Sequence, residues 1–248
     1  MKRKKFKVIK IVLLSLAGLL LISLAGFYIW SQQTYSASAE MIELVGEENI
    51  QQEQDWLIFT PEQGMAESAG LILYPGAKVE PEAYSYLGKG LAERGYTVII
   101  PEVLLNFAFL DVNKADEIRS AYPEIKTWYI GGHSLGGVAA ASYAHGNVEQ
   151  LGGIVFLGSY PADSDDFSGT DLPILSIYGE FDGLTTTDKI DSTQHLLTSN
   201  AVLQEIEGGN HAQFGMYGPQ KGDQAATISA VEQQDFIIDT IANWLDSL

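Results

Sequence analysis

The chain has 248 residues, enough for a domain with a substantial core, and its 46% hydrophobic and 19% charged residues exclude a disordered or collagen-like protein. It contains no cysteine, which excludes disulfide scaffolds, thiolate metal sites and a cysteine nucleophile. Its 14 basic and 32 acidic residues give a net charge of −18, so the chain is poorly suited to bind the phosphates of a nucleic acid.

The charges are unevenly distributed along the chain. The first ten residues hold six of the 14 basic side chains and no acidic one. The other 238 residues carry eight basic and all 32 acidic side chains, which is a net charge of −24. The sequence therefore joins a short basic tip, residues 1–10, to a strongly acidic remainder.

Residues 11–30 contain no charged side chain, and as a helix they would span roughly 30 Å, the thickness of a membrane's hydrocarbon core. We expect a transmembrane anchor whose basic tip stays in the cytoplasm, so that the rest of the chain lies outside the cell membrane. The alternative is a signal peptide cleaved near Ala39, where Ala37-Ser38-Ala39 has a small-x-small pattern. Residues 31–54 are polar and are expected to form a tether.

Residues 55–248 alternate short apolar runs with helical patterns. Several runs are continuous apolar blocks, as expected for strands that are buried on both faces of a parallel sheet. The sequence predicts an α/β fold with a mostly parallel sheet of seven or eight strands and helices on both faces. The predicted strands are Trp56–Phe59, Leu71–Tyr74, Thr97–Ile100, Thr127–Ile130, Gly153–Leu157, Ile174–Tyr178 and Val202–Ile206.

The most informative local motif is Gly132-His133-Ser134-Leu135-Gly136, between a predicted strand and a predicted helix. Gly-x-Ser-x-Gly in this context is typical of a nucleophile elbow, a tight turn that holds a serine in strained backbone geometry at the start of a helix. A phosphate-binding turn is a weaker interpretation, because no lysine follows at the position it would need. Ser134 is therefore the candidate nucleophile.

A nucleophilic serine needs a base, and the chain offers only four histidines. His211 follows a predicted strand in a glycine-rich loop, at the sheet edge where catalytic groups of parallel sheets gather. The other three, His133, His145 and His195, are expected to be structural or surface residues. His211 is the candidate base.

The base in turn needs an orienting carboxylate, which in this chain order should lie between Ser134 and His211. Asp182 follows the predicted strand 174–178 directly and is the candidate acid, with Glu180 as the alternative. The oxyanion hole is expected to use the backbone amide of Leu135, the residue after the nucleophile, and that of Ala77, in the loop Pro75-Gly76-Ala77.

Four motifs in this order carry a family resemblance: Pro-Gly-Ala at 75–77, Gly-His-Ser-Leu-Gly-Gly at 132–137, Gly-Glu-Phe-Asp-Gly at 179–183 and Gly-Gly-Asn-His at 208–211. Together they resemble the α/β-hydrolase fold over about residues 56–248. Within that superfamily the chain looks like the small bacterial dienelactone-hydrolase-like group, the α/β-hydrolase fold-5 type. Ser134 stands where true dienelactone hydrolases have cysteine, so their specific activity is not implied.

The expected function is that of a membrane-anchored, extracytoplasmic serine hydrolase, a carboxylesterase that acts on a small-molecule ester through an acyl-enzyme. An amidase or peptidase of the same fold, or a non-catalytic surface binding protein, is the alternative. No cofactor is expected, and no two histidines have a metal-ligand spacing such as His-Glu-x-x-His. The short stretch between the predicted strands 153–157 and 174–178 leaves no room for a large cap.

Overall fold

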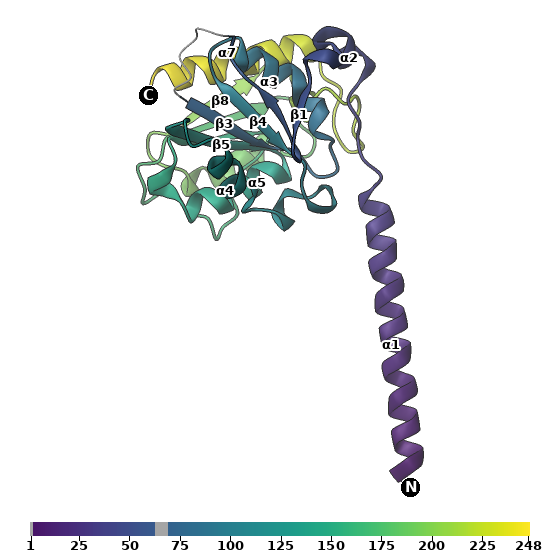
Figure 1. Ribbon diagram of the computed structural model, residues 1–248. Helices are drawn as coiled ribbons and strands as arrows, with labels where there is room; N and C mark the ends of the chain where they lie inside the picture. The colour runs from purple at the N-terminus through teal and green to yellow at the C-terminus, as the bar shows by residue number, and fades with distance from the viewer. Residues whose placement is uncertain (1, 63–68) are drawn as a thin grey trace. The chain divides into compact units, whose positions relative to one another are not determined.

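The computed structural model describes residues 2–62 and 69–248 (Figure 1). It divides the chain into two units, with the boundary between Thr34 and Tyr35. The first unit contains one helix, α1 (Lys2–Ser31), and the apolar helix expected over residues 11–30 is therefore present. Its apolar stretch, Ile9–Ser31, has 23 residues and a mean hydropathy of 2.4, and is long and apolar enough to cross a membrane.

The second unit is built on one eight-stranded sheet in the order β1-β2-β4-β3-β5-β6-β7-β8. The first strand pairs antiparallel with the second and the second antiparallel with the fourth, whereas all other neighbours are parallel. This confirms the predicted α/β fold. The strands are β1 (Gln51–Glu53), β2 (Trp56–Phe59), β3 (Ala69–Tyr74), β4 (Thr97–Pro101), β5 (Thr127–His133), β6 (Gly153–Leu157), β7 (Ile174–Gly179) and β8 (Val202–Ile206).

Helices connect the strands and cover the sheet. The α-helices are α2 (Ala39–Val45), α3 (Ser85–Ala92), α4 (Lys114–Ala121), α5 (Leu135–His145), α6 (Thr187–Thr193) and α7 (Ala230–Asp246). Short 3₁₀ turns lie between them: η1 (Glu47–Asn49), η2 (Pro81–Tyr84), η3 (Leu104–Asn106), η4 (Ala108–Leu110), η5 (Val148–Gln150), η6 (Gln194–Leu196) and η7 (Ala212–Phe214).

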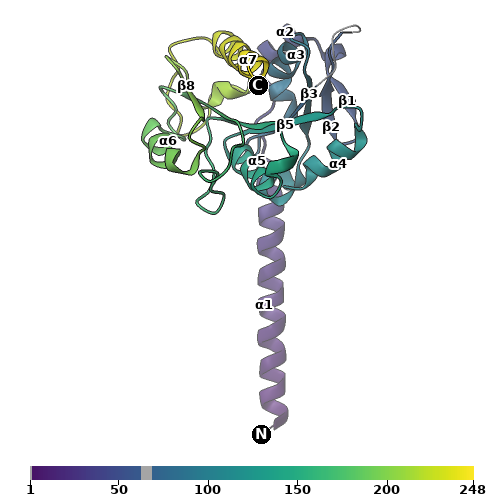
Figure 2. The same cartoon turned by 90° about the vertical axis from the view of Figure 1, so that its left-hand side faces the viewer.

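The sheet is buried on both faces because its central strands are mostly apolar on both sides. In β3, Leu71 and Leu73 face the core layer that contains α3 and α7, whereas Ile72 and Tyr74 face the layer that contains α4 and α5. This alternation follows from the two-residue period of a strand. Figures 1 and 2 show α3 and α7 on one side of the sheet and α4 and α5 on the other.

The connection between β6 and β7 decides how open the carboxyl edge of the sheet is. Residues 158–173, all of which the structure describes, form turns and extended segments without a helix or a strand. No helical cap is therefore inserted at this point of the fold, as the short spacing in the sequence predicts.

The folded unit begins earlier than the sequence predicts. Tyr35 already forms a β-bridge with Val79, and α2 buries Met41 and Val45 against Met216. Most of the expected tether, residues 31–54, is therefore part of the folded unit, and only residues 32–34 lie between α1 and Tyr35. Met41 and Val45 are four residues apart and so lie on one face of α2, and the Ser38 amide before the helix donates to the carbonyl oxygen of Met216.

Substitutions in α2 test this assignment. Met41 is fully buried, so Met41→Ala is expected to lower the free energy of unfolding by about 2–5 kcal/mol. Leu44→Ala is the matched control, because this neighbouring side chain is 46% exposed and its truncation should change stability by less than about 1 kcal/mol. Guanidinium unfolding of the full chain measures both values, and equal stability of the two variants would show that α2 is not part of the folded unit.

Candidate active site

Ser134 lies at a sharp turn between β5 and α5. Its backbone angles, φ 54° and ψ −125°, are unfavourable for a residue with a side chain. The turn is tight enough that a Cβ atom on Gly132 would lie 2.3 Å from the carbonyl carbon of Gly136. The Ser159 hydroxyl donates to the carbonyl oxygen of Ser134 at 2.6 Å and helps to hold the turn. This geometry is that of a nucleophile elbow, and the Ser134 residue is partly exposed at its tip.

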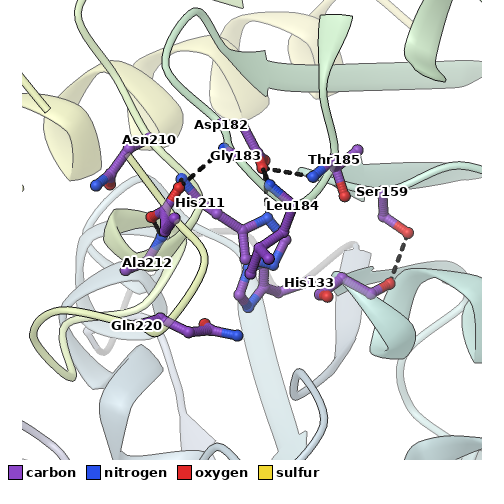
Figure 3. Close-up of polar contacts among 12 residues, drawn as sticks. His133, Ser159, Asp182, Gly183, Leu184, Thr185, Asn210, His211, Ala212 and Gln220 are labelled. Carbon is purple, nitrogen blue, oxygen red and sulfur yellow. Dashed lines mark hydrogen bonds and ion pairs between the residues drawn. The ribbon is translucent and has the colours of Figure 1, made fainter. Parts of the chain in front are cut away.

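Asp182 and His211 form a buried pair at the same edge of the sheet (Figure 3). The Asp182 Oδ2 atom lies 2.7 Å from Nδ1 of His211, and both side chains are inaccessible to solvent. The carboxylate thus binds the Nδ1 side of the ring and leaves Nε2 as the atom that can accept a proton. In the described part of the chain, Nε2 of His211 is buried and has no hydrogen-bond partner.

The loop after β7 holds the Asp182 carboxylate in place. Its other oxygen, Oδ1, accepts hydrogen bonds from the backbone amides of Leu184 at 2.8 Å and Thr185 at 2.5 Å (Figure 3). Glu180, the alternative acid, is engaged elsewhere: its carboxylate accepts from the backbone amide of Gly208 at 2.9 Å. The structure therefore brings Asp182, and not Glu180, to the imidazole of His211.

The backbone of Ser134 is linked to the strand next to this pair. The Ser134 amide donates to the carbonyl oxygen of Leu157 at 3.0 Å, at the end of β6. The following residue, Gly158, packs against the acid, since a Cβ atom there would lie 3.0 Å from Oδ2 of Asp182. The structure thus places the three predicted residues Ser134, Asp182 and His211 after the carboxyl ends of β5, β7 and β8, at one edge of the sheet. Within the described residues, no hydrogen bond joins Ser134 to Nε2 of His211.

Asp223 is a positioning residue that the sequence analysis did not single out. Its carboxylate accepts hydrogen bonds from the backbone amides of Gly183 at 3.0 Å, His211 at 3.3 Å and Ala212 at 2.8 Å. One side chain thereby joins the loop that carries the candidate acid to the loop that carries the candidate base. In a chain with 32 acidic residues, nothing local distinguishes Asp223 from a surface charge.

The loop after β3 packs directly on the start of α5. A Cβ atom on Gly136 would lie 2.4 Å from the carbonyl oxygens of both Tyr74 and Pro75. The two predicted oxyanion donors, the amides of Ala77 and Leu135, therefore come from two segments in close contact. Neither amide donates to another group within the described residues, so both remain available to a ligand.

His133 is buried beside His211 and is not a surface residue. The two imidazole rings have centroids 4.5 Å apart, and Nδ1 of His133 lies 2.9 Å from the hydroxyl of Tyr84. The same hydroxyl accepts a hydrogen bond from the amide of Gly76 at 2.9 Å, in the predicted oxyanion loop. Burial, together with the neighbouring His211, lowers the pKa of His133, so this ring stays neutral near neutral pH.

The remaining two histidines lie away from this edge. His145 is exposed at the end of α5, where it packs edge-on against Phe167, and His195 is exposed with Nδ1 2.9 Å from the carbonyl oxygen of Ser192. Among the described residues, no group of three or more histidine, aspartate or glutamate side chains is placed to hold a metal ion.

Comparison with known proteins agrees with this architecture. A sequence model described as the alpha/beta hydrolase family matches residues 70–235, and the chain therefore belongs to this family of hydrolases. No curated protein matches the chain in sequence.

Solved structures show the same fold at low sequence identity. Est1E from Butyrivibrio proteoclasticus has a TM-score of 0.59 and 12% identity, over 79% of this chain and 98% of that one. The esterase domain of a Rhodothermus marinus protein has a TM-score of 0.57 and 14% identity, over 76% and 90% of the two chains. A dienelactone hydrolase from Anabaena variabilis has a TM-score of 0.58 and 16% identity, over 77% and 90%.

Glycine substitutions test the contact between the loop after β3 and the start of α5. Gly136→Ala places a methyl group against two backbone carbonyls, so it should displace one of the two segments and lower the kcat of hydrolysis by about 10²-fold or more. Gly146→Ala, at the end of the same helix, meets its nearest atom at 3.6 Å and should leave the rate unchanged. Initial rates of ester hydrolysis compare the two variants, and equal rates would contradict the predicted oxyanion hole.

Proposed function

We propose that the protein is a serine carboxylesterase with Ser134 as nucleophile, His211 as general base and Asp182 as the orienting acid. The observation that supports this most strongly is the buried Asp182–His211 pair, which leaves Nε2 as the one ring nitrogen able to accept a proton, at the sheet edge that carries Ser134. A buried carboxylate is costly unless its hydrogen bonds are satisfied, and here the Nδ1–H group of a neutral His211 supplies one of them.

In the proposed reaction, Oγ of Ser134 attacks the ester carbonyl while its proton passes to Nε2 of His211. Asp182 keeps the other proton of the ring on Nδ1 and stabilises the imidazolium that forms. The negative charge that develops on the carbonyl oxygen is stabilised by the amides of Leu135 and Ala77. His211 then gives its proton to the leaving alcohol, and a water molecule activated by the same ring releases the acid from Ser134.

The neutral His133 fits this role for His211. A charged neighbour at a centroid distance of 4.5 Å would oppose formation of the His211 imidazolium, whereas a neutral ring does not. The contact of His133 with Tyr84, and of Tyr84 with Gly76, links the surroundings of the base to the loop of Ala77. A displacement of His133 or Tyr84 is therefore expected to affect both proton transfer and oxyanion stabilisation.

The preference for an ester over an amide rests on the structural neighbours. One of them is described as an esterase domain, and Est1E has been solved with ferulic acid bound. The absence of a helix in residues 158–173 supports an open site in which small esters bind without a cap.

We also propose that α1 anchors the protein in a membrane with the hydrolase unit outside the cytoplasm. The large apolar side chains of α1 from Ile9 to Trp30 are exposed, for example Leu13 at 61% and Leu21 at 67%, which is suited to lipid and not to water. The basic residues before this stretch favour the cytoplasmic side.

Covalent labelling with a fluorophosphonate probe tests the catalytic proposal. The wild-type chain should take the label in proportion to its loss of ester-hydrolysing activity, because the probe phosphonylates an activated serine. Ser134→Ala should take no label, whereas Ser142→Ala, which changes an exposed serine on α5, keeps the nucleophile and should still be labelled. Labelling of Ser134→Ala at the wild-type rate, or a wild-type chain that takes no label, would refute the proposal.

A further inference from the structure

Exposed apolar side chains lie in the segment between β4 and α4 and at the start of α5, where Leu135 follows Ser134. The segment 103–110 has the sequence Val-Leu-Leu-Asn-Phe-Ala-Phe-Leu and contains no charged residue, although the chain has 14 basic and 32 acidic residues. Leu104 is 57% exposed, Phe109 48% and Leu110 42%. The turn η4 packs on α5, whose first residue, Leu135, is also 42% exposed. We call Leu104, Phe109, Leu110 and Leu135 the apolar rim.

The backbone holds this rim in place at some energetic cost. Leu105 and Asn106 have φ values of 55° and 61°, a conformation that L-residues other than asparagine and aspartate seldom adopt. The carbonyl oxygen of Asn106 accepts a hydrogen bond from the amide of Lys78 at 2.8 Å, next to Ala77. The segment that exposes Leu104 is thus fixed to the loop that carries a proposed oxyanion donor.

The chain that leaves α1 attaches at the same loop. The amide of Tyr35 donates to the carbonyl oxygen of Lys78 at 2.6 Å, and the carbonyl oxygen of Tyr35 accepts from the amide of Glu80 at 3.0 Å. The Tyr35 ring contacts that of Tyr217 at a centroid distance of 5.5 Å, and Tyr217 lies 6.2 Å from His133 by the same measure. The point of attachment is therefore at the margin of the candidate active site.

The link between the anchor helix and this point is short. Ser31, the last residue of α1, is four peptide units from Tyr35, so their Cα atoms lie within about 14 Å of each other in any orientation of the two units. Lys78 is hydrogen-bonded to Tyr35, and neighbouring backbone segments lie about 5 Å apart, so its loop is within about 20 Å of the end of α1. If α1 spans a membrane, this loop is held near the membrane surface. A flexible tether of the length the sequence suggested would impose no such limit.

We propose that the mouth of the Ser134 site lies against the membrane that holds α1, and that its substrate is a carboxylic ester carried in that membrane, such as the acyl ester of a lipid. This deepens, and rests on, the proposed function. The uncharged apolar rim is the surface suited to the headgroup and acyl boundary, because apolar side chains there are removed from water. The strongly acidic remainder of the unit favours a zwitterionic over an anionic lipid surface.

The test uses the full-length protein reconstituted in phosphatidylcholine vesicles and two substrates. One is a water-soluble short-chain ester, p-nitrophenyl acetate, and the other is a fluorogenic long-chain diacyl ester embedded in the vesicles. The first variant carries a Gly/Ser insertion of about 20 residues between Gln33 and Thr34, which frees the unit to move some 25 Å from the surface. The second is Phe109→Ser combined with Leu110→Ser, with Phe236→Ser on α7 as its control, since Phe236 is 37% exposed.

Both variants should hydrolyse the soluble ester within about twofold of the wild-type rate, and the embedded ester at least about fivefold more slowly, whereas Phe236→Ser should match wild type on both. Equal rates of wild type and both variants on the embedded ester would overturn the proposal, and so would a wild-type chain that hydrolyses only the soluble ester. A mature protein that begins near Ala39 and is found in the medium would also overturn it. Hydrolysis of neither ester by the wild type would refute the proposed function itself.

Discussion

The tight packing of the turn after β5 is the constraint on which the rest of the candidate site depends. Ser134 has a left-handed φ that costs on the order of 1–3 kcal/mol, and the turn persists because its neighbours leave no alternative. Cβ atoms on Gly136 and Gly137 would each lie 2.4 Å from another group, the backbone of residues 74–75 and the Ser159 hydroxyl respectively. The two glycines therefore let the loop after β3, the start of α5 and the loop after β6 pack together next to Ser134.

Asp182 and His211, the candidate acid and base, are held in place by a different set of contacts. Asp182 and His211 lie in loops that are separated in sequence, and the loops are joined through backbone hydrogen bonds to the single carboxylate of Asp223. Because these bonds involve the main chain of the two loops, they position the loops without using the side chains of Asp182 and His211. In the proposed mechanism this leaves Nε2 of His211 unbonded until the serine proton arrives.

The sequence predicted the parts of the fold that buried apolar residues specify. Strands such as β3 and β6 are continuous apolar blocks, and the glycine-serine motif follows a strand directly, so fold and candidate nucleophile could both be inferred. The strand β1 could not be predicted. Its residues Gln51, Gln52 and Glu53 are all exposed, and it joins the sheet by backbone pairing with β2. Neither Asp223 nor the contact of Tyr84 with His133 could be found, because both depend on residues that only the folded chain brings together.

Replacement of His211 tests the central claim most directly, namely that His211 acts as base on Ser134. Without the imidazole, no side chain at this position can accept the serine proton, so His211→Ala should lower the kcat of ester hydrolysis by about 10²–10⁴-fold. His195→Ala is the matched control, because His195 is exposed and lies away from this edge of the sheet, and it should keep the wild-type rate. A folded His211→Ala variant with the wild-type kcat would contradict the account.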